Sequence, residues 1–134
     1  MENIKVIHKF PRPTQYNELR KSVGWNPLQT SKVKLGLENS TYCICIEKED
    51  ILIGFGRIVG DGATIFYIQD LMINPLYQKQ NIGTLIMNKL MDYINNHCDD
   101  NSFIGLIALN ESDKFYKQFG FTYHKNNNFY RYKL

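Results

Sequence analysis

A short polar turn in the middle of the chain combines carboxamide side chains, a lysine and a glycine. It consists of Gln78, Lys79, Gln80, Asn81, Ile82 and Gly83. An amphipathic periodic segment follows directly, so the turn is expected to open a helix. The first backbone N–H groups of a helix have no partner within it and lie at the positive end of the helix dipole. The turn therefore predicts a phosphate or pyrophosphate site, where Gly83 lets a ligand approach the backbone and Lys79 adds charge.

A carboxylate precedes this turn on an apolar strand. Because strand side chains alternate, Phe66, Ile68, Asp70 and Met72 are expected to share one face. Desolvation among apolar neighbours makes a carboxylate a stronger base, so Asp70 is a candidate base or substrate-orienting group. The alternatives are that Asp70 caps a loop or pairs with Arg57 on the neighbouring strand. A bulge would break the alternation and move the side chain elsewhere.

Other nucleotide and metal chemistry is not indicated. The sequence has neither the G-x-x-x-x-G-K-[ST] pattern of P-loops nor a G-x-G-x-x-G after a strand. Cys43 and Cys45 alternate within an apolar run, which predicts two core residues on one strand face. His8, His97 and His124 lack the spacing of a metal site or a catalytic triad. We therefore expect no metal.

The elements that position these groups follow from the hydrophobic periodicity. Three antiparallel strands are expected over Thr41–Glu47, Ile51–Val59 and Thr64–Asn74, with a strand and two short helices before them. A long helix beginning at Ile82 follows. The chain is then expected to close with a strand over Ser102–Leu109, a helix over Glu111–Gln118, and a hairpin of Phe121–His124 and Phe129–Tyr132. This order predicts an α/β fold with a mixed, mostly antiparallel sheet and helices on both faces.

Length and composition are those of a single globular domain over residues 1–134. Hydrophobic residues make up 43% of the chain and the net charge is +3, which is far from the footprint of a dedicated nucleic-acid binder. The N-terminus carries no apolar signal core, and no apolar run reaches the roughly 20 residues of a membrane span. We therefore expect a cytoplasmic protein with no nucleic-acid or membrane partner.

Two motifs in this order resemble the GNAT superfamily, the Gcn5-related N-acetyltransferases. The family's acetyl-CoA signature, Q/R-x-x-G-x-G/A, is matched from Gln78 to Gly83, with Asn81 in place of the first glycine. Asparagine tolerates a positive φ better than most residues, so the loop is expected to keep its shape. The segment from Tyr116 to Phe121 resembles the family's Tyr-x-x-x-Gly-Phe. The element order is also that of the family, which implies the GNAT fold.

The resemblance implies roles for individual positions. Backbone groups of Leu71, Met72 and Ile73 would pair with the pantetheine arm of acetyl-CoA as an added strand, and the amides from Lys79 to Thr84 would cradle its pyrophosphate. Tyr116 matches the tyrosine that protonates the departing thiolate, although its neighbours Phe115 and Phe119 also allow a packing role. Asn110 matches a pantetheine-contacting asparagine, one residue closer to the tyrosine than is common.

These observations predict an acetyl-CoA-dependent N-acetyltransferase that transfers acetyl directly to a primary amine. A small molecule is favoured as acceptor because aromatic residues are available to wall in a compact site: Trp25, Phe66, Tyr67, Phe129 and Tyr130. A protein N-terminus or lysine as acceptor, and a non-catalytic acyl-CoA-binding sensor or subunit, stay open as alternatives. The resemblance also allows a homodimer.

Overall fold

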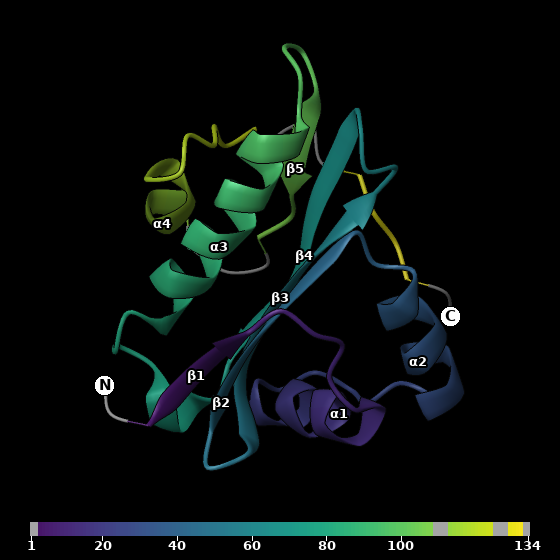
Figure 1. The fold of residues 1–134 in the computed structure, drawn as a ribbon, viewed down its shortest axis with the longest axis vertical. Coiled ribbons are helices and arrows are strands. Elements are labelled where there is room, and N and C mark those ends of the chain that lie inside the picture. Colours follow the sequence, from purple (N-terminus) through teal and green to yellow (C-terminus); the bar gives the residue numbers. More distant parts are fainter. Residues whose placement is uncertain (1–2, 109–112, 125–128, 133–134) are drawn as a thin grey trace.

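The computed structural model describes residues 3–108, 113–124 and 129–132 (Figure 1). The first half of the chain forms a strand, two helices and a three-stranded meander. These elements are β1 (Ile4–Ile7), α1 (Pro13–Ser22), α2 (Thr30–Glu38), β2 (Tyr42–Lys48), β3 (Ile51–Gly60) and β4 (Ile65–Ile73). The second half continues with a 3-10 turn, η1 (Pro75–Tyr77), then α3 (Ile82–His97), β5 (Phe103–Leu106) and α4 (Asp113–Lys117).

One five-stranded sheet holds the molecule together, in the order β1-β2-β3-β4-β5. The first three pairings are antiparallel and the last, between β4 and β5, is parallel. The predicted mixed sheet is therefore confirmed, and so is its mostly antiparallel character. The parallel pair requires a crossover connection, which η1 and α3 provide.

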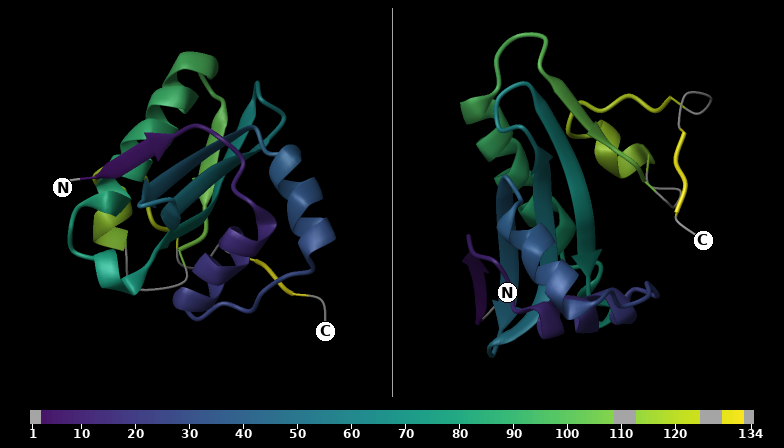
Figure 2. Two further views of the ribbon diagram at one scale, coloured as in Figure 1. Left: turned by 60° about the horizontal axis from the view of Figure 1, so that its bottom comes forward. Right: turned by 90° about the vertical axis from the view of Figure 1, so that its right-hand side faces the viewer.

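The two faces of the sheet carry different helices. Helices α1 and α2 lie on one face and α3 lies on the other, which the left view of Figure 2 shows clearly. The apolar side of α3 is formed by Ile82, Ile86, Met87, Leu90 and Ile94, all buried against strand residues such as Ile46 and Ile58. A second core, under α1 and α2, contains both buried cysteines, Cys43 and Cys45, as expected from their alternation.

Strand β4 contains a bulge that changes which side chains share a face. Gly56 of β3 stands opposite two residues of β4, because Phe55 pairs with Met72 while Arg57 pairs with Gln69. The extra residue is Asp70, whose φ is +60°. The prediction that Asp70 shares a face with Phe66 and Ile68 is therefore wrong.

After the bulge, the side chains of β4 point to the other face of the sheet. Phe66 and Ile68 pack in the α3 core, whereas Met72 packs in the α1–α2 core and Asp70 bonds to α1. A bulge adds one residue to one strand only, so every side chain beyond it points to the opposite face from the one that simple alternation gives.

The C-terminal region differs from the expected closing hairpin. Residues 121–124 and 129–132 form no strands in the described part of the chain. Most of their aromatic side chains are exposed, with Phe129 at 89% and Tyr132 at 69%, whereas Phe121 packs against the α3 core. Alternating aromatic residues form a strand only where the edge of a neighbouring strand is available to pair with them. The sequence pattern does not tell whether such an edge exists.

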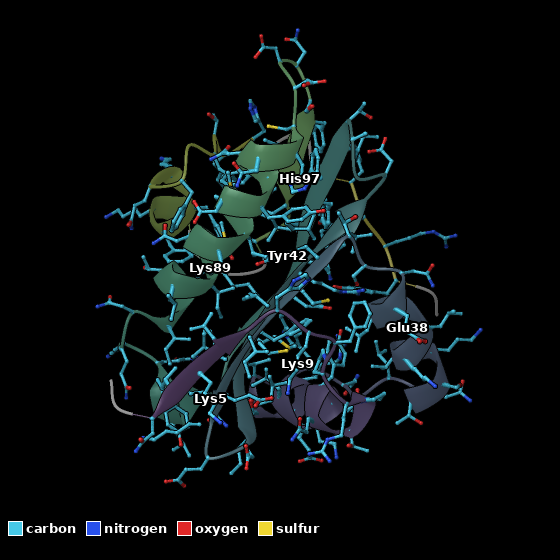
Figure 3. The ribbon with its side chains drawn as sticks, in the orientation of Figure 1. Lys5, Lys9, Glu38, Tyr42, Lys89 and His97 are labelled. Carbon is cyan, nitrogen blue, oxygen red and sulfur yellow. The ribbon has the colours of Figure 1, made fainter. Side chains whose placement is uncertain are left out.

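Two side-chain contacts attach β2 to the connection before α1 and to α3. Lys9, at the approach to α1 in Figure 3, forms an ion pair of 2.6 Å with the buried Glu47 of β2. Tyr42 and His97, both labelled in Figure 3, belong to a stack of rings in which the Tyr93 ring centre lies 4.4 Å from that of Tyr42 and 4.0 Å from that of His97.

Within the described residues, no helix combines the length and apolar character that a membrane crossing requires.

Candidate functional site

The pairing of strands β4 and β5 ends where the bulge begins. Their ladder runs from Ile65 opposite Phe103 to Ile68 opposite Leu106, whereas β4 continues to Ile73. The right view of Figure 2 shows β5 turning away from the end of β4. Among the described residues, the β5-facing backbone groups of β4 beyond Ile68 therefore have no sheet partner. A backbone edge of this kind can pair with an extended ligand as if it were another strand.

The turn after β4 leads to the N-terminus of α3 through two left-handed residues. Lys79 has a φ of +64°, and Asn81, the N-cap, has a φ of +63°. Asparagine thus adopts the conformation that was expected for the position of the first glycine. The Asn81 side chain makes no capping hydrogen bond, and the first turn of α3 contains no acidic residue.

This helix end is suited to an anion. The amides of Ile82, Gly83 and Thr84 belong to the first helical turn, whose N–H groups have no carbonyl partner in the helix. Lys79 is exposed beside them. Lys48, from the end of β2, brings a second cation near the turn, since its ammonium lies 5.4 Å from the centre of the Tyr77 ring. Donors, dipole and cations together favour a phosphate or pyrophosphate group.

The remaining turn residues have separate places. Gln78 donates its side-chain amide to the carbonyl of Ile73 at 3.4 Å, which ties the turn to the end of β4. Gln80 is exposed. A side chain on Gly83 would lie 3.4 Å from Phe115 and 3.5 Å from Ile73. Both are ordinary contact distances, so the packing of α4 and β4 alone does not require glycine here, and the missing side chain leaves the helix end open.

Asp70 lies in a buried polar cluster on the opposite face of the sheet. Its side chain is 1% exposed. One carboxylate oxygen accepts hydrogen bonds from the Tyr16 hydroxyl at 2.5 Å and from Nε of Arg57 at 2.9 Å. Nη1 of Arg20 lies 3.9 Å from the other oxygen, which also accepts a bond of 3.3 Å from Gln69. The ion pair with Arg57, one of the alternatives for Asp70, is therefore present.

The environment of this cluster acts strongly on Tyr16. Burial, followed by the negative charge and hydrogen bond of Asp70, raises the pKa of Tyr16 to about 12. The phenol consequently keeps its proton at neutral pH and donates it to the carboxylate in a hydrogen bond. Tyr16 also packs edge-on against Phe55, with ring centres 5.6 Å apart.

Tyr116 lies on α4, against the α3 side of the sheet. Its ring is half-buried, packs against the α3 core and meets Phe115 and Phe121 edge-on, at 5.0 Å and 6.4 Å between ring centres. Burial raises the pKa of Tyr116 above its ordinary value. The hydroxyl carries its proton at neutral pH, as an ordinary tyrosine does, and is able to donate a proton or a hydrogen bond.

The structure brings together some of the predicted residues and separates others. Phe115 connects α4 to Gly83 and Ile73, so Tyr116 belongs to the same side of the sheet as the turn. Asp70 lies on the α1 side, across the sheet from both. Asn110 lies outside the described residues. Within the described part of the chain, no three His, Cys, Asp or Glu side chains form a group that could hold a metal ion.

Sequence reasoning missed two side chains of the polar cluster, Tyr16 and Arg20. They are four residues apart on α1 and therefore lie on the same face of this helix. That spacing was the available signal, but it gains meaning only when the bulge turns Asp70 toward α1. The ring of Tyr16 and the ring of Trp25 both lie against the guanidinium of Arg20, at 6.0 Å and 5.5 Å from its centre.

Comparisons with known proteins agree with this geometry. The model of a family described as acetyltransferase (GNAT) domain matches residues 23–133. An uncharacterized N-acetyltransferase, ycf52, of Pyropia yezoensis is 32% identical over 111 residues. The match covers 80% of this chain and 63% of that protein, so the chain spans less than two thirds of this relative's length.

Solved structures give the same result. A protein of unknown function from meticillin-resistant Staphylococcus aureus, described as a probable acetyltransferase, is 34% identical, with a TM-score of 0.90 over 98% of both chains. AAC(6')-Iy, solved with the bisubstrate analogue CoA-S-monomethyl-acetylneamine, has a TM-score of 0.70 at 13% identity, over 98% of this chain and 99% of that one. At 13% identity, this second likeness shows the fold alone.

Proposed function

This chain belongs to the GNAT family of acetyltransferases, and we propose that it transfers an acetyl group from acetyl-CoA directly to a primary amine of a small molecule. The proposal rests on one observation. The N-terminus of α3, which has no side-chain cap and no acidic residue, lies beside the point where β4 and β5 separate. A pyrophosphate at the helix end and an extended arm along β4 are the two features of CoA that such a site would bind.

On the donor side, we assign the cofactor to backbone groups. The amides from Lys79 to Thr84 would hold the pyrophosphate, with Gln78 and Gln80 completing the turn. The β4 backbone at Leu71, Met72 and Ile73 would pair with the pantetheine arm, because this edge has no sheet partner among the described residues. Asn110 keeps its proposed contact with the same arm on the strength of the family resemblance.

Direct transfer makes specific demands on the residues around the thioester. The neutral amine nitrogen attacks the thioester carbonyl carbon, a C–N bond forms, the C–S bond breaks, and the nitrogen gives up a proton to water. Backbone N–H groups of Leu71 or Met72 are suited to stabilise the developing oxyanion, since the bulge presents this backbone at the gap. Tyr116, whose hydroxyl carries its proton at neutral pH, would supply the proton to the departing thiolate and regain one from water.

We assign Asp70 an orienting duty on the acceptor side. Its carboxylate is almost fully buried and already accepts hydrogen bonds from Tyr16, Arg57 and Gln69. A base must reach the proton that it removes, whereas an orienting group needs only fixed partners. Asp70 would therefore hold Tyr16 and Arg57 in place where the amine approaches the thioester.

The test of the donor site uses one residue of the first helical turn. Thr84 is the third residue of α3, a position where glutamate favours helix formation. We expect Thr84→Glu to fold at least as stably as the wild type and to bind acetyl-CoA about tenfold or more weakly in calorimetric titration, because its charge repels the pyrophosphate. The matched neutral variant Thr84→Gln should bind nearly as the wild type does. Equal affinity in all three proteins would disprove the pyrophosphate assignment.

Transfer itself is tested by thiol release with acetyl-CoA and a panel of amines. The panel includes small primary amines and a lysine-containing peptide, so that it covers both acceptor classes. Binding of acetyl-CoA without release of thiol on any amine would leave an acyl-CoA-binding module and refute the enzymatic proposal.

A further inference from the structure

The polar cluster on the α1–α2 face holds more positive than negative charge. The guanidinium groups of Arg20 and Arg57 both contact Asp70, and in the described residues no other carboxylate pairs with either of them. Both side chains are mostly buried, at 16% and 19% exposure. Two cations that share one carboxylate leave an excess positive charge, and a mostly buried charge is costly unless a counter-ion is close.

Arg57 has donors left to offer. Its Nε donates to Asp70, and its Nη1 donates to the carbonyl of Gly36 at 3.2 Å and to the hydroxyl of Ser40 at 3.0 Å. These bonds fix the guanidinium in one orientation. A guanidinium has five N–H donors, so with respect to the described residues the two on Nη2 stay available to a group that enters beside Arg57.

A small cavity adjoins this guanidinium. It has a volume of about 80 Å³ and lies between α1, α2 and β3, lined by Tyr16, Leu28, Lys32, Val33, Gly36, Leu37 and Arg57. Lys32 of α2 is exposed and adds a second cation to the wall. No carboxylate belongs to this lining. The cavity holds a group of a few heavy atoms, and its charge selects for an anion.

The cavity shares its walls with the acceptor side of the proposed reaction. Tyr16 and Arg57 line the cavity and also hydrogen-bond to Asp70, the residue at the bulge. The bulge lies where β4 and β5 separate, so a ligand held in the cavity could extend its other end toward the gap. Cationic surroundings also favour the neutral form of an amine, which is the form that attacks a thioester.

We infer that the amine acceptor carries a carboxylate or a phosphate, which Arg57 and Lys32 bind in the cavity between α1 and α2. This inference rests on the proposed acetyl transfer and specifies its acceptor. A planar guanidinium forms bidentate hydrogen bonds with either anion, and the ammonium of Lys32 adds a positive charge without a preferred geometry.

The experiment compares amines that differ only in the anionic group. L-phenylalanine is paired with phenethylamine to test a carboxylate, and phosphoethanolamine is paired with ethanolamine to test a phosphate. Thiol release from acetyl-CoA gives kcat/KM for each amine, and calorimetric titration in the presence of CoA gives its dissociation constant. We expect at least one anion-bearing amine to exceed the partner that lacks the anion about tenfold or more in both measurements.

Variants of α2 assign the preference to the cavity. Lys32→Gln should reduce several-fold the ratio between the values for the anion-bearing amine and for the partner that lacks the anion. Lys34→Gln removes the same charge from an exposed position of the same helix that does not line the cavity, and it should keep the ratio of the wild type. Both positions are exposed, so neither substitution is expected to disturb folding.

The two proposals fail in different ways. Equal values within both pairs, in transfer and in binding, would overturn the anionic acceptor while leaving acetyl transfer intact. A chain that binds the anionic amines selectively but releases no thiol would refute the transfer and support the cavity assignment. A preference that Lys32→Gln and Lys34→Gln reduce equally would also overturn the inference, because it would reflect overall charge.

Discussion

The carboxylate of Asp70 accepts hydrogen bonds from three elements, one helix and two strands. Tyr16 comes from α1, Arg57 from β3, and Gln69 precedes Asp70 in β4. A buried charge with several donors fixes the positions of its partners as well as its own. At the scale of single residues, we therefore regard this cluster as the part of the acceptor side that is already arranged before a ligand binds.

Tyr16 gives this cluster a signature at alkaline pH. Burial and Asp70 raise its pKa to about 12 in the folded protein, from an ordinary value near 10. The stabilisation is present in full below pH ~10 and is lost as the pH rises toward 12, because the unfolded chain releases its proton first. We expect the urea-unfolding free energy of Tyr16→Phe to fall less steeply than that of the wild type across this window. Parallel curves would contradict the assignment.

Tyr116 is expected to act on turnover rather than on cofactor binding. Removing its hydroxyl in Tyr116→Phe keeps the ring that packs against Phe115 and Phe121, so the fold should be unaffected. Loss of a general acid should lower kcat by about a hundredfold, with little change in the dissociation constant of acetyl-CoA. An unchanged kcat would show that Tyr116 is only a packing residue.

At the scale of elements, the junction between β4 and α3 carries the donor site. Its left-handed residues, Lys79 and Asn81, set the angle at which the chain enters α3. Asn81 could be predicted from the sequence, because asparagine is among the few residues that tolerate this conformation. Lys79 could not, because lysine has no such preference and its φ follows from the shape of the whole turn.

The conformation of Asn81 leads to a direct prediction. Asn81→Gly should preserve both folding stability and acetyl-CoA affinity, because glycine adopts a positive φ without strain. Asn81→Val should cost about 1–2 kcal/mol of folding stability and weaken acetyl-CoA binding, since a β-branched residue is strained at this position. Thermal unfolding and titration of the two variants check this. Equal binding by both would mean that the turn does not hold the cofactor.

The bulge shows where reasoning from sequence reaches its limit. Alternation correctly placed the meander and its cores, because each strand carries its own apolar pattern. The face of Asp70 could not be found in this way, since the bulge depends on how β3 and β4 align: Gly56 faces two residues. The prediction of the closing hairpin was wrong for a similar reason. A strand at 129–132 requires a neighbouring strand to pair with, and the residues of the segment itself do not tell whether one is present.

At the scale of the whole molecule, the sheet separates two sides with different chemistry. The α3 side offers a bare helix end and Tyr116, while the α1–α2 side offers the Asp70 cluster and the cationic cavity. The gap between β4 and β5 is the place where a group held on one side can meet a group held on the other. This division accounts for two catalytic candidates that lie across the sheet from each other.

The central claim, that acetyl-CoA lies along the end of β4 with its pyrophosphate at α3, is tested most directly by amide chemical shifts. We would titrate isotope-labelled protein with acetyl-CoA and follow every backbone N–H. The largest shifts are predicted in Leu71–Ile73 and in Lys79–Thr84. The contradicting result would be shifts centred elsewhere, such as the hollow of about 530 Å³ beside α1, whose lining includes Glu18, Lys21 and Ile51.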